Sequence, residues 1–413
     1  MTVAFLAAIV SFSAYTCIFS FRKAFNVAAY QGYTLWGIDY KIVLVITQVF
    51  GYMLSKFYGI RFIAELKRIG RGKLIILLVG ISWAAWLLFA LLPAPYNFWC
   101  LFLNGFPLGM LWGIVFSYVE GRRTTDLISA SLAVSFIFAS GLAKSVAQYL
   151  MSSWNVSEYW MPFVTGLVFM PPLLLFVYLL EKIPAPDDND KAERTERLPM
   201  TKERRWQLVK EFYPGLTALV LIYILITILR EIRDNFMADM WRESGELFQP
   251  AVFAKTETII SIIILVMIAS MVLVRNNFRA FLLAQIIMLA GFVLALLVTF
   301  MYTNGHLNLF TWMTTIGLGL YMVYIPFNSI LFDRFIAAFR YAGNTGFLIY
   351  IADSFGYLGS VGVLLSRSLF SIKINWLSFY TGMVSWVAVF GIIGVVISMI
   401  YFVRKKKGMR YEV

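Results

Sequence analysis

Hydrophobic residues occur along the whole chain in long runs, and short polar stretches separate one run from the next. A membrane-spanning helix needs about 20 predominantly apolar residues, and the runs predict twelve such helices. Six precede a polar stretch in the middle of the chain and six follow it. The predicted spans are 3–29, 39–60, 73–92, 98–118, 125–151 and 160–181, then 213–238, 250–274, 280–302, 308–331, 339–367 and 375–403.

The polar stretch between the two sets of spans, residues 184–212, has mixed charge and few apolar residues. This composition predicts a linker that ends in an amphipathic lead-in helix. The chain is therefore expected to form an N-terminal six-helix bundle (1–181), a cytoplasmic linker (182–212) and a C-terminal six-helix bundle with a basic tail (213–413). Because this is the layout of major facilitator transporters, we predict an all-α membrane protein of that fold.

The composition supports a membrane protein and indicates its orientation. The chain is 61% hydrophobic and 14% charged, which excludes a soluble domain, and its formal net charge is +13. In such a chain an excess of Lys and Arg reports topology rather than nucleic-acid binding. The basic residues gather in alternate loops and in the tail, so both termini and the linker are predicted to be cytoplasmic, with the protein in the inner membrane.

Motifs for catalysis or for metal and nucleotide binding are absent from the sequence. Cys17 and Cys100 lie in apolar runs, which disfavours a structural disulfide, and no metal-ligand spacing occurs. There is no Gly-rich nucleotide loop, His/Cys cluster or nucleophile elbow. The sequence therefore argues against an enzyme or an ATP-driven pump, and no cofactor is expected.

Arg22 stands deep in the first span, next to Lys23. A guanidinium in hydrocarbon costs at least ~2.5–3.5 kcal/mol, so it usually faces a protein interior or a wet cavity. Tyr15 lies two helical turns earlier and shares a face with Arg22, whereas Lys23 is rotated by about 100° and is expected to face elsewhere. The hypothesis is that Tyr15 and Arg22 line a path for an anion.

Two lysines in the first half of the chain are further candidates. Lys56 follows Tyr52 by four residues in the second span, so both lie on one face. From position alone, Lys56 is interpreted as a lysine that snorkels to the inner surface. Lys144 lies past the middle of the fifth span.

The seventh span carries Arg230, Glu231 and Asp234. Arg230 and Asp234 are four residues apart and could form a local ion pair. Alternatively, Arg230 faces a cavity, since it lies about as deep in its span as Arg22 does in the first. Two such arginines would clasp one anionic group, because their planar donors match phosphate or carboxylate oxygens.

Other polar and small residues have more local interpretations. Asp353, deep in the eleventh span, is either half of a structural ion pair or a proton-coupling site. Charged residues near the outer ends of spans are expected to snorkel as interfacial anchors; they are Asp39, Lys41, Lys255 and Glu257. Gly105 and Gly109 in the fourth span form a small-xxx-small edge, which predicts close helix packing.

Several short motifs, taken in order, resemble one transporter family. They are Tyr15 with Phe21-Arg22-Lys23-Ala24-Phe25, Tyr52 with Ser55-Lys56-Phe57, Gly105 with Gly109-Met110 and Trp112, and Phe355-Gly356-Tyr357-Leu358-Gly359. With these, the chain resembles the organophosphate:phosphate antiporters of the major facilitator superfamily, which include the glycerol phosphate and hexose phosphate exchangers. A divergent, uncharacterised Bacteroidetes branch of that superfamily is suggested.

The resemblance implies a substrate site between the two halves near the membrane midplane, with one arginine from each half, Arg22 and Arg230. It adds Tyr52, Lys56 and Tyr357 as site residues, and so favours the pore for Lys56. The chain also departs from the family. The family's histidine in the fifth span has no counterpart here, although Lys144 lies nearby, and Asp353 is an additional acid.

The expected function is secondary active transport of a small organic anion, such as a sugar phosphate or another organophosphate, by alternating access in an antiporter. The expected partners are this anionic substrate and the lipid bilayer, without nucleic acid, and the protein is expected to act as a monomer. Two alternatives stay open. One is a membrane-embedded sensor of such a ligand, and the other is a proton-coupled transporter of a neutral or peptidoglycan-derived solute, which would suit Asp353.

Overall fold

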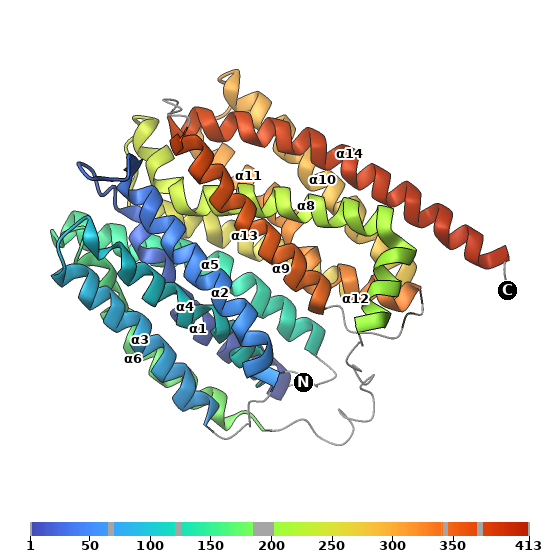
Figure 1. Ribbon diagram of the computed structural model, residues 1–413, viewed down its shortest axis with the longest axis horizontal. Helices are drawn as coiled ribbons and strands as arrows, with labels where there is room; N and C mark the ends of the chain where they lie inside the picture. Colours follow the sequence, from blue (N-terminus) through green and yellow to red (C-terminus); the bar gives the residue numbers. More distant parts are fainter. Residues whose placement is uncertain are drawn as a thin grey trace. The chain divides into compact units, whose positions relative to one another are not determined.

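The computed structural model describes residues 2–64, 70–119, 125–184, 202–339, 341, 346–369 and 375–411. This part of the chain is helical apart from one short hairpin (Figure 1). The α-helices are α1 (Thr2–Lys23), α2 (Tyr40–Ala64), α3 (Arg71–Leu91), α4 (Trp99–Phe116), α5 (Thr125–Ser153), α6 (Met161–Lys182), α8 (Lys202–Glu243), α9 (Val252–Val272), α10 (Asn277–Thr303), α11 (Leu309–Ser329), α12 (Leu331–Ala338), α13 (Gly346–Leu369) and α14 (Trp376–Tyr411). Two 3₁₀ helices, η1 (Ala24–Val27) and η2 (Tyr96–Phe98), and two strands, β1 (Thr34–Leu35) and β2 (Ile38–Asp39), complete it.

Most of these helices are long enough to cross a bilayer. Within the described residues, ten segments are both long and apolar enough to do so. Two more long helices, α2 with 25 residues and α13 with 24, occupy the positions of the predicted second and eleventh spans. The prediction of an all-α, multi-pass membrane protein is therefore confirmed.

The chain groups into two compact units that differ from the two predicted halves. Unit 1 comprises Met1–Arg194, Ile232–Ser261 and Val361–Leu377, and unit 2 comprises Thr195–Glu231, Ile262–Ser360 and Ser378–Val413. Helix α8 thus gives its first part to unit 2 and its last part to unit 1. The predicted division at a linker stays a prediction, because residues 185–201 lie outside the described part. The same holds for these basic loop residues: Lys67, Arg68, Arg122, Arg123, Arg340 and Lys373.

In unit 1, α1 packs against α4, α5 and α6, while α3 lies beside α6 (Figure 1). Helix α2 packs along α4, and glycines line the contact. A Cβ atom on Gly109 would lie 2.7 Å from Ser55 Cβ, and one on Gly51 would lie 2.7 Å from the Phe102 carbonyl oxygen. A Cβ atom on Gly105 would lie closer still to the carbonyl oxygen of Gln48. The predicted small-xxx-small packing edge is confirmed.

Helix α1 ends at Lys23, six residues before the predicted end of the first span, and η1 follows it. The apolar sequence continues through this point and conceals the helix end. Side chains of neighbouring helices hydrogen-bond the last carbonyl oxygens of α1: Trp86 Nε1 and Asn104 Nδ2 donate to Phe21 O at 2.7 and 3.2 Å, and Gln48 Nε2 donates to Arg22 O at 3.0 Å. These donors satisfy carbonyl groups that a terminated helix leaves unpaired.

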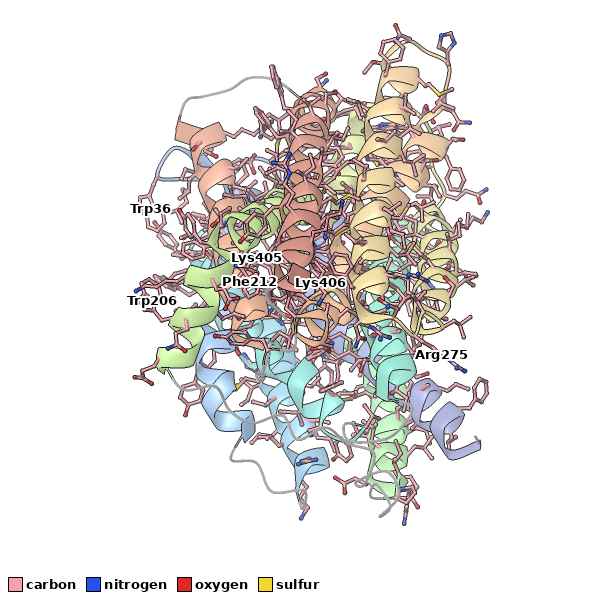
Figure 2. All side chains as sticks on the ribbon, turned by 90° about the vertical axis from the view of Figure 1, so that its right-hand side faces the viewer. Trp36, Trp206, Phe212, Arg275, Lys405 and Lys406 are labelled. Atoms are coloured by element: carbon pink, nitrogen blue, oxygen red, sulfur yellow. The ribbon has the colours of Figure 1, made fainter. Side chains whose placement is uncertain are left out.

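A β-hairpin, which the sequence pattern did not predict, connects η1 to α2. Thr34 pairs with Asp39 and Leu35 with Ile38, so the turn consists of Trp36 and Gly37. Their φ angles are 54° and 75°, and two positive values are what a tight type I′ hairpin turn requires. Trp36 is exposed at this turn (Figure 2).

In unit 2, α8 begins with the predicted amphipathic lead-in, and this prediction is confirmed. The helix bends at Phe212, where φ is −114° and ψ is 17°. Pro214 follows two residues later and has no N–H for the helical bond to Lys210 O, which accounts for the bend. Leu208 and Phe212 are buried, whereas Trp206 is exposed.

Candidate functional site

Charged side chains buried inside the protein define the candidate site. In the described residues, six basic and four acidic side chains are almost fully buried. They are Arg22, Lys23, Lys41, Lys144, Arg230 and Arg233, with Glu231, Asp234, Glu257 and Asp353. Because a buried charge costs several kcal/mol unless it is paired or hydrogen-bonded, the surroundings of each group indicate what it does.

The first group, the arginine–tyrosine cluster, consists of Tyr15, Arg22, Tyr52 and Lys56 in unit 1. The Arg22 guanidinium carbon lies 3.7 Å from the centre of the Tyr52 ring, and Lys56 Nζ lies 5.2 Å from the same ring. Tyr15 is buried within electrostatic range of the other three. The structure thus brings together the residues that shared faces in the sequence. The attraction of a cation to the face of a desolvated aromatic ring contributes about 2 kcal/mol or more.

The second group, the Asp234 network, also lies in unit 1. Asp234 accepts hydrogen bonds from Lys23 Nζ at 2.6 Å and Lys144 Nζ at 2.5 Å, and from the Ser140 hydroxyl. The side-chain oxygen of Asn235 accepts from Lys23 Nζ at 2.9 Å. Lys23 therefore faces away from the Arg22 face, as predicted, but toward α5 and α8. Asp234 has partners on α1 and α5 that its local sequence does not indicate.

Two further ion pairs correct the prediction of interfacial anchors. Arg233 Nη1 lies 2.7 Å from Glu257 Oε1, and Lys41 Nζ lies 2.6 Å from Asp239 Oδ2. The interpretation of Glu257 and Lys41 as snorkelling residues is wrong, because both are buried against α8, which supplies their partners. Asp39 and Lys255 are exposed, as an interfacial position requires.

In unit 2, Arg230 is the only almost fully buried basic residue of the described part. Its Nη2 lies 2.6 Å from Glu231 Oε1, and its guanidinium carbon lies 4.4 Å from the centre of the Tyr324 ring. Tyr357 is buried within electrostatic range of Arg230. Arg230 thus combines a carboxylate neighbour with aromatic rings.

Asp353, also in unit 2, accepts a short hydrogen bond from the hydroxyl of Tyr223. Asn328 Nδ2 donates to the Tyr223 oxygen at 3.2 Å, so the three side chains form a chain of hydrogen bonds. A tyrosine hydroxyl can donate to a carboxylate and accept from a carboxylic acid. This arrangement is compatible with either charge state of Asp353, and both interpretations of that residue stay open.

Sequence reasoning missed the uncharged polar residues that position these groups: Gln48, Asn104, Ser140, Tyr223, Asn235 and Asn328. The available signal was an isolated amide or hydroxyl side chain within an apolar run, since polar groups are rare in spans and usually mark a function or a packing role. No group of three or more potential metal ligands occurs in the described residues.

Comparisons with known proteins identify the fold and the family of the chain. No curated protein matches its sequence. The crystal structure of the human organic anion transporter MFSD10 (TETRAN) is similar, with a TM-score of 0.55 and 13% identity over 96% of this chain and 98% of that chain. At this identity the similarity shows the fold alone, and it confirms the predicted major facilitator fold. A model of a family of unknown function, DUF5690, matches residues 24–405. The chain is therefore a membrane protein with the major facilitator fold and belongs to the family DUF5690.

Proposed function

We propose that this protein is a secondary active transporter of a small organic anion, with the arginine–tyrosine cluster as part of its binding site. The observation that supports this proposal most directly is the excess of buried positive charge in the described part of unit 1. Among the described residues of unit 1, the almost fully buried basic residues are Arg22, Lys23, Lys41, Lys144 and Arg233, against Asp234 and Glu257, and Asp239, with a 13% exposed side chain, is one further acid. An anion would compensate this excess.

The chemistry of the cluster suits a phosphate or a carboxylate. The guanidinium of Arg22 offers several donors in one plane, which match two oxygens of such a group. Tyr15 and Tyr52 carry hydroxyl donors, and Lys56 adds a second cation. Binding an anion here would lower the electrostatic cost of excluding water from these cations, which is how alternating access would depend on substrate.

Of the remaining predicted substrate ligands, some are kept in the proposed binding site and one is given a structural role. That Arg230 binds the same anion as Arg22, with help from Tyr357, stays a prediction. Lys144 is bonded to Asp234, so we propose that it stabilises the protein rather than contacts substrate. Residence in the inner membrane with both termini in the cytoplasm remains part of the proposal, supported by the basic residues of the loops and tail.

Transport assays with the purified protein in liposomes test the proposal. Vesicles loaded with unlabelled phosphate or glycerol 3-phosphate should take up labelled organic phosphate, and a dicarboxylate should compete. Binding without flux would support the sensor alternative. Flux of a neutral sugar with no effect of any anion would overturn the proposal.

Asp353 provides a separate test of proton coupling. If its carboxyl carries the proton, Asp353→Asn should abolish the dependence of uptake on an imposed pH gradient while exchange of substrate persists. Tyr223→Phe removes the hydroxyl that contacts the carboxyl and should displace the pH profile without abolishing it. Unchanged profiles in both variants, measured from mildly acidic to mildly alkaline pH, would assign Asp353 a structural role.

A further inference from the structure

Helix α14 carries a surface groove at its basic end, outside the buried groups described above. The groove has a volume of about 470 Å³ and is lined by Ile397, Ile400, Tyr401, Arg404 and Lys405. Their spacing of three, one, three and one residues places them on one continuous face of the helix. Along about 12 Å of helix the lining therefore changes from aliphatic, through an aromatic hydroxyl, to cationic.

The position of this groove relative to a bilayer follows from the length of α14. Its span-like segment, Trp376–Gly408, has 33 residues and is about 50 Å long, whereas a hydrocarbon core is about 30 Å thick. The consecutive basic residues at 404–407 cannot lie in hydrocarbon, so they mark the level of the lipid headgroups. Ile397 and Ile400 are about half exposed and lie at the depth of the acyl chains.

The lead-in of α8 forms the neighbouring surface. The Tyr401 hydroxyl donates to Glu211 O at 3.2 Å, and Lys405 Nζ lies 5.6 Å from the centre of the Phe212 ring. Trp206 is exposed on the same lead-in. Tryptophan and tyrosine with an apolar body and a polar edge favour the boundary between headgroups and hydrocarbon.

Most of the basic side chains near the groove are at least partly exposed, so their charges are accessible to a ligand. Arg404 and Lys407 are exposed. Lys405 is 35% exposed and lies 4.0 Å from Glu211, itself 39% exposed, which is a weak solvated pair. Lys406 instead donates to Ala338 O at 2.7 Å and stabilises the end of α12. Figure 2 shows Lys405, Lys406 and Phe212 together, with Arg275 well apart from them.

We propose that this groove is a binding site for an anionic phospholipid of the leaflet that surrounds the basic end of α14. The phosphate lies against Arg404 and Lys405, Tyr401 lies at the glycerol level, and an acyl chain covers Ile397 and Ile400. The apolar half of the groove favours a lipid over a free phosphate, because only a molecule with both a phosphate and an acyl chain contacts the basic residues and the isoleucines together.

The test measures lipid binding by native mass spectrometry and by thermal unfolding, with phosphatidylglycerol or phosphatidylcholine added to detergent-purified protein. Phosphatidylglycerol should bind at least one discrete site and raise the unfolding temperature. Each basic residue at a membrane surface contributes about 1 kcal/mol, so Arg404→Gln with Lys405→Gln should weaken binding about 25-fold.

Two control variants distinguish specific binding of the lipid in this groove from nonspecific attraction of an anionic lipid to positive charge. Arg275→Gln with Arg279→Gln removes the same charge from exposed positions elsewhere and should leave the discrete binding unchanged. Ile400→Trp keeps the charge but fills the groove and should also weaken binding. Equal binding of both lipids, equal loss in the control pair, an unaffected Ile400→Trp variant, or full competition by soluble glycerol 3-phosphate would each overturn the proposal.

Discussion

Replacement of Asp234 by asparagine should destabilise the protein more than any other single change proposed. Asp234 is buried and binds both Lys23 and Lys144. Without its charge, two buried ammonium groups lose their carboxylate, and such a loss costs about 3–5 kcal/mol. We expect a marked fall in the unfolding temperature and in the yield of monodisperse protein, measured in one detergent for all variants.

A double variant makes this expectation specific. Lys144→Gln added to Asp234→Asn returns the site to the net charge of the native network, so the double variant should be more stable than the Asp234→Asn single variant. Asp239→Asn serves as the matched control. Asp239 also binds a buried lysine, Lys41, but lies closer to the surface, and its loss should cost less. Additive effects of Asp234→Asn and Lys144→Gln would show that the two side chains do not interact in the protein.

Replacement of Arg22 by lysine should abolish most anion binding although the charge is kept. An ammonium group cannot reproduce the planar donors of a guanidinium, nor its stacking on the Tyr52 ring at 3.7 Å. Loss of one charge-assisted contact costs about 1.5–3 kcal/mol, which corresponds to roughly 10- to 100-fold weaker binding. Calorimetry or competition for uptake in liposomes would measure the change.

Arg71→Lys is the control for this substitution. Arg71 also lies near a tyrosine ring, that of Tyr118 at 5.8 Å, and donates to a backbone carbonyl, at Ser117. It stands at the start of α3, so its replacement should not change anion affinity. Equal affinity of the Arg22→Lys variant and the unchanged protein would remove Arg22 from the binding site, and equal losses in both variants would indicate a general effect on stability.

The sequence predicted the arginine–tyrosine cluster because its members obey local spacing. Tyr15 and Arg22 are seven residues apart, and Tyr52 and Lys56 are four apart, so each pair shares a helix face whatever else the chain does. For the two pairs to meet at the Tyr52 ring, it was sufficient that α1 and α2 lie in the same unit. Fold class was predictable for a similar reason, since long apolar runs leave few alternatives to spanning helices.

The Asp234 network was not predictable from spacing, because its members are far apart in the chain. Lys23 and Asp234 are separated by 211 positions, and the local pattern offered Arg230 as a nearer partner for Asp234. The end of α1 was not predictable either, because the residues that terminate this helix are not its neighbours in the sequence. Ala24–Val27 continues the apolar run, and the donors that terminate the helix come from Gln48, Trp86 and Asn104 on other helices.

The division of α8 between the two units has a thermodynamic consequence. Glu231, in unit 2, and Asp234, in unit 1, are three residues apart on one helix, a rise of about 4.5 Å. Glu231 contacts Arg230, and Asp234 binds Lys23 and Lys144. Thermodynamic linkage makes any coupling between two such sites reciprocal. If an anion that displaces Glu231 from Arg230 alters the stability of the Asp234 network, that network alters the affinity for the anion by the same factor.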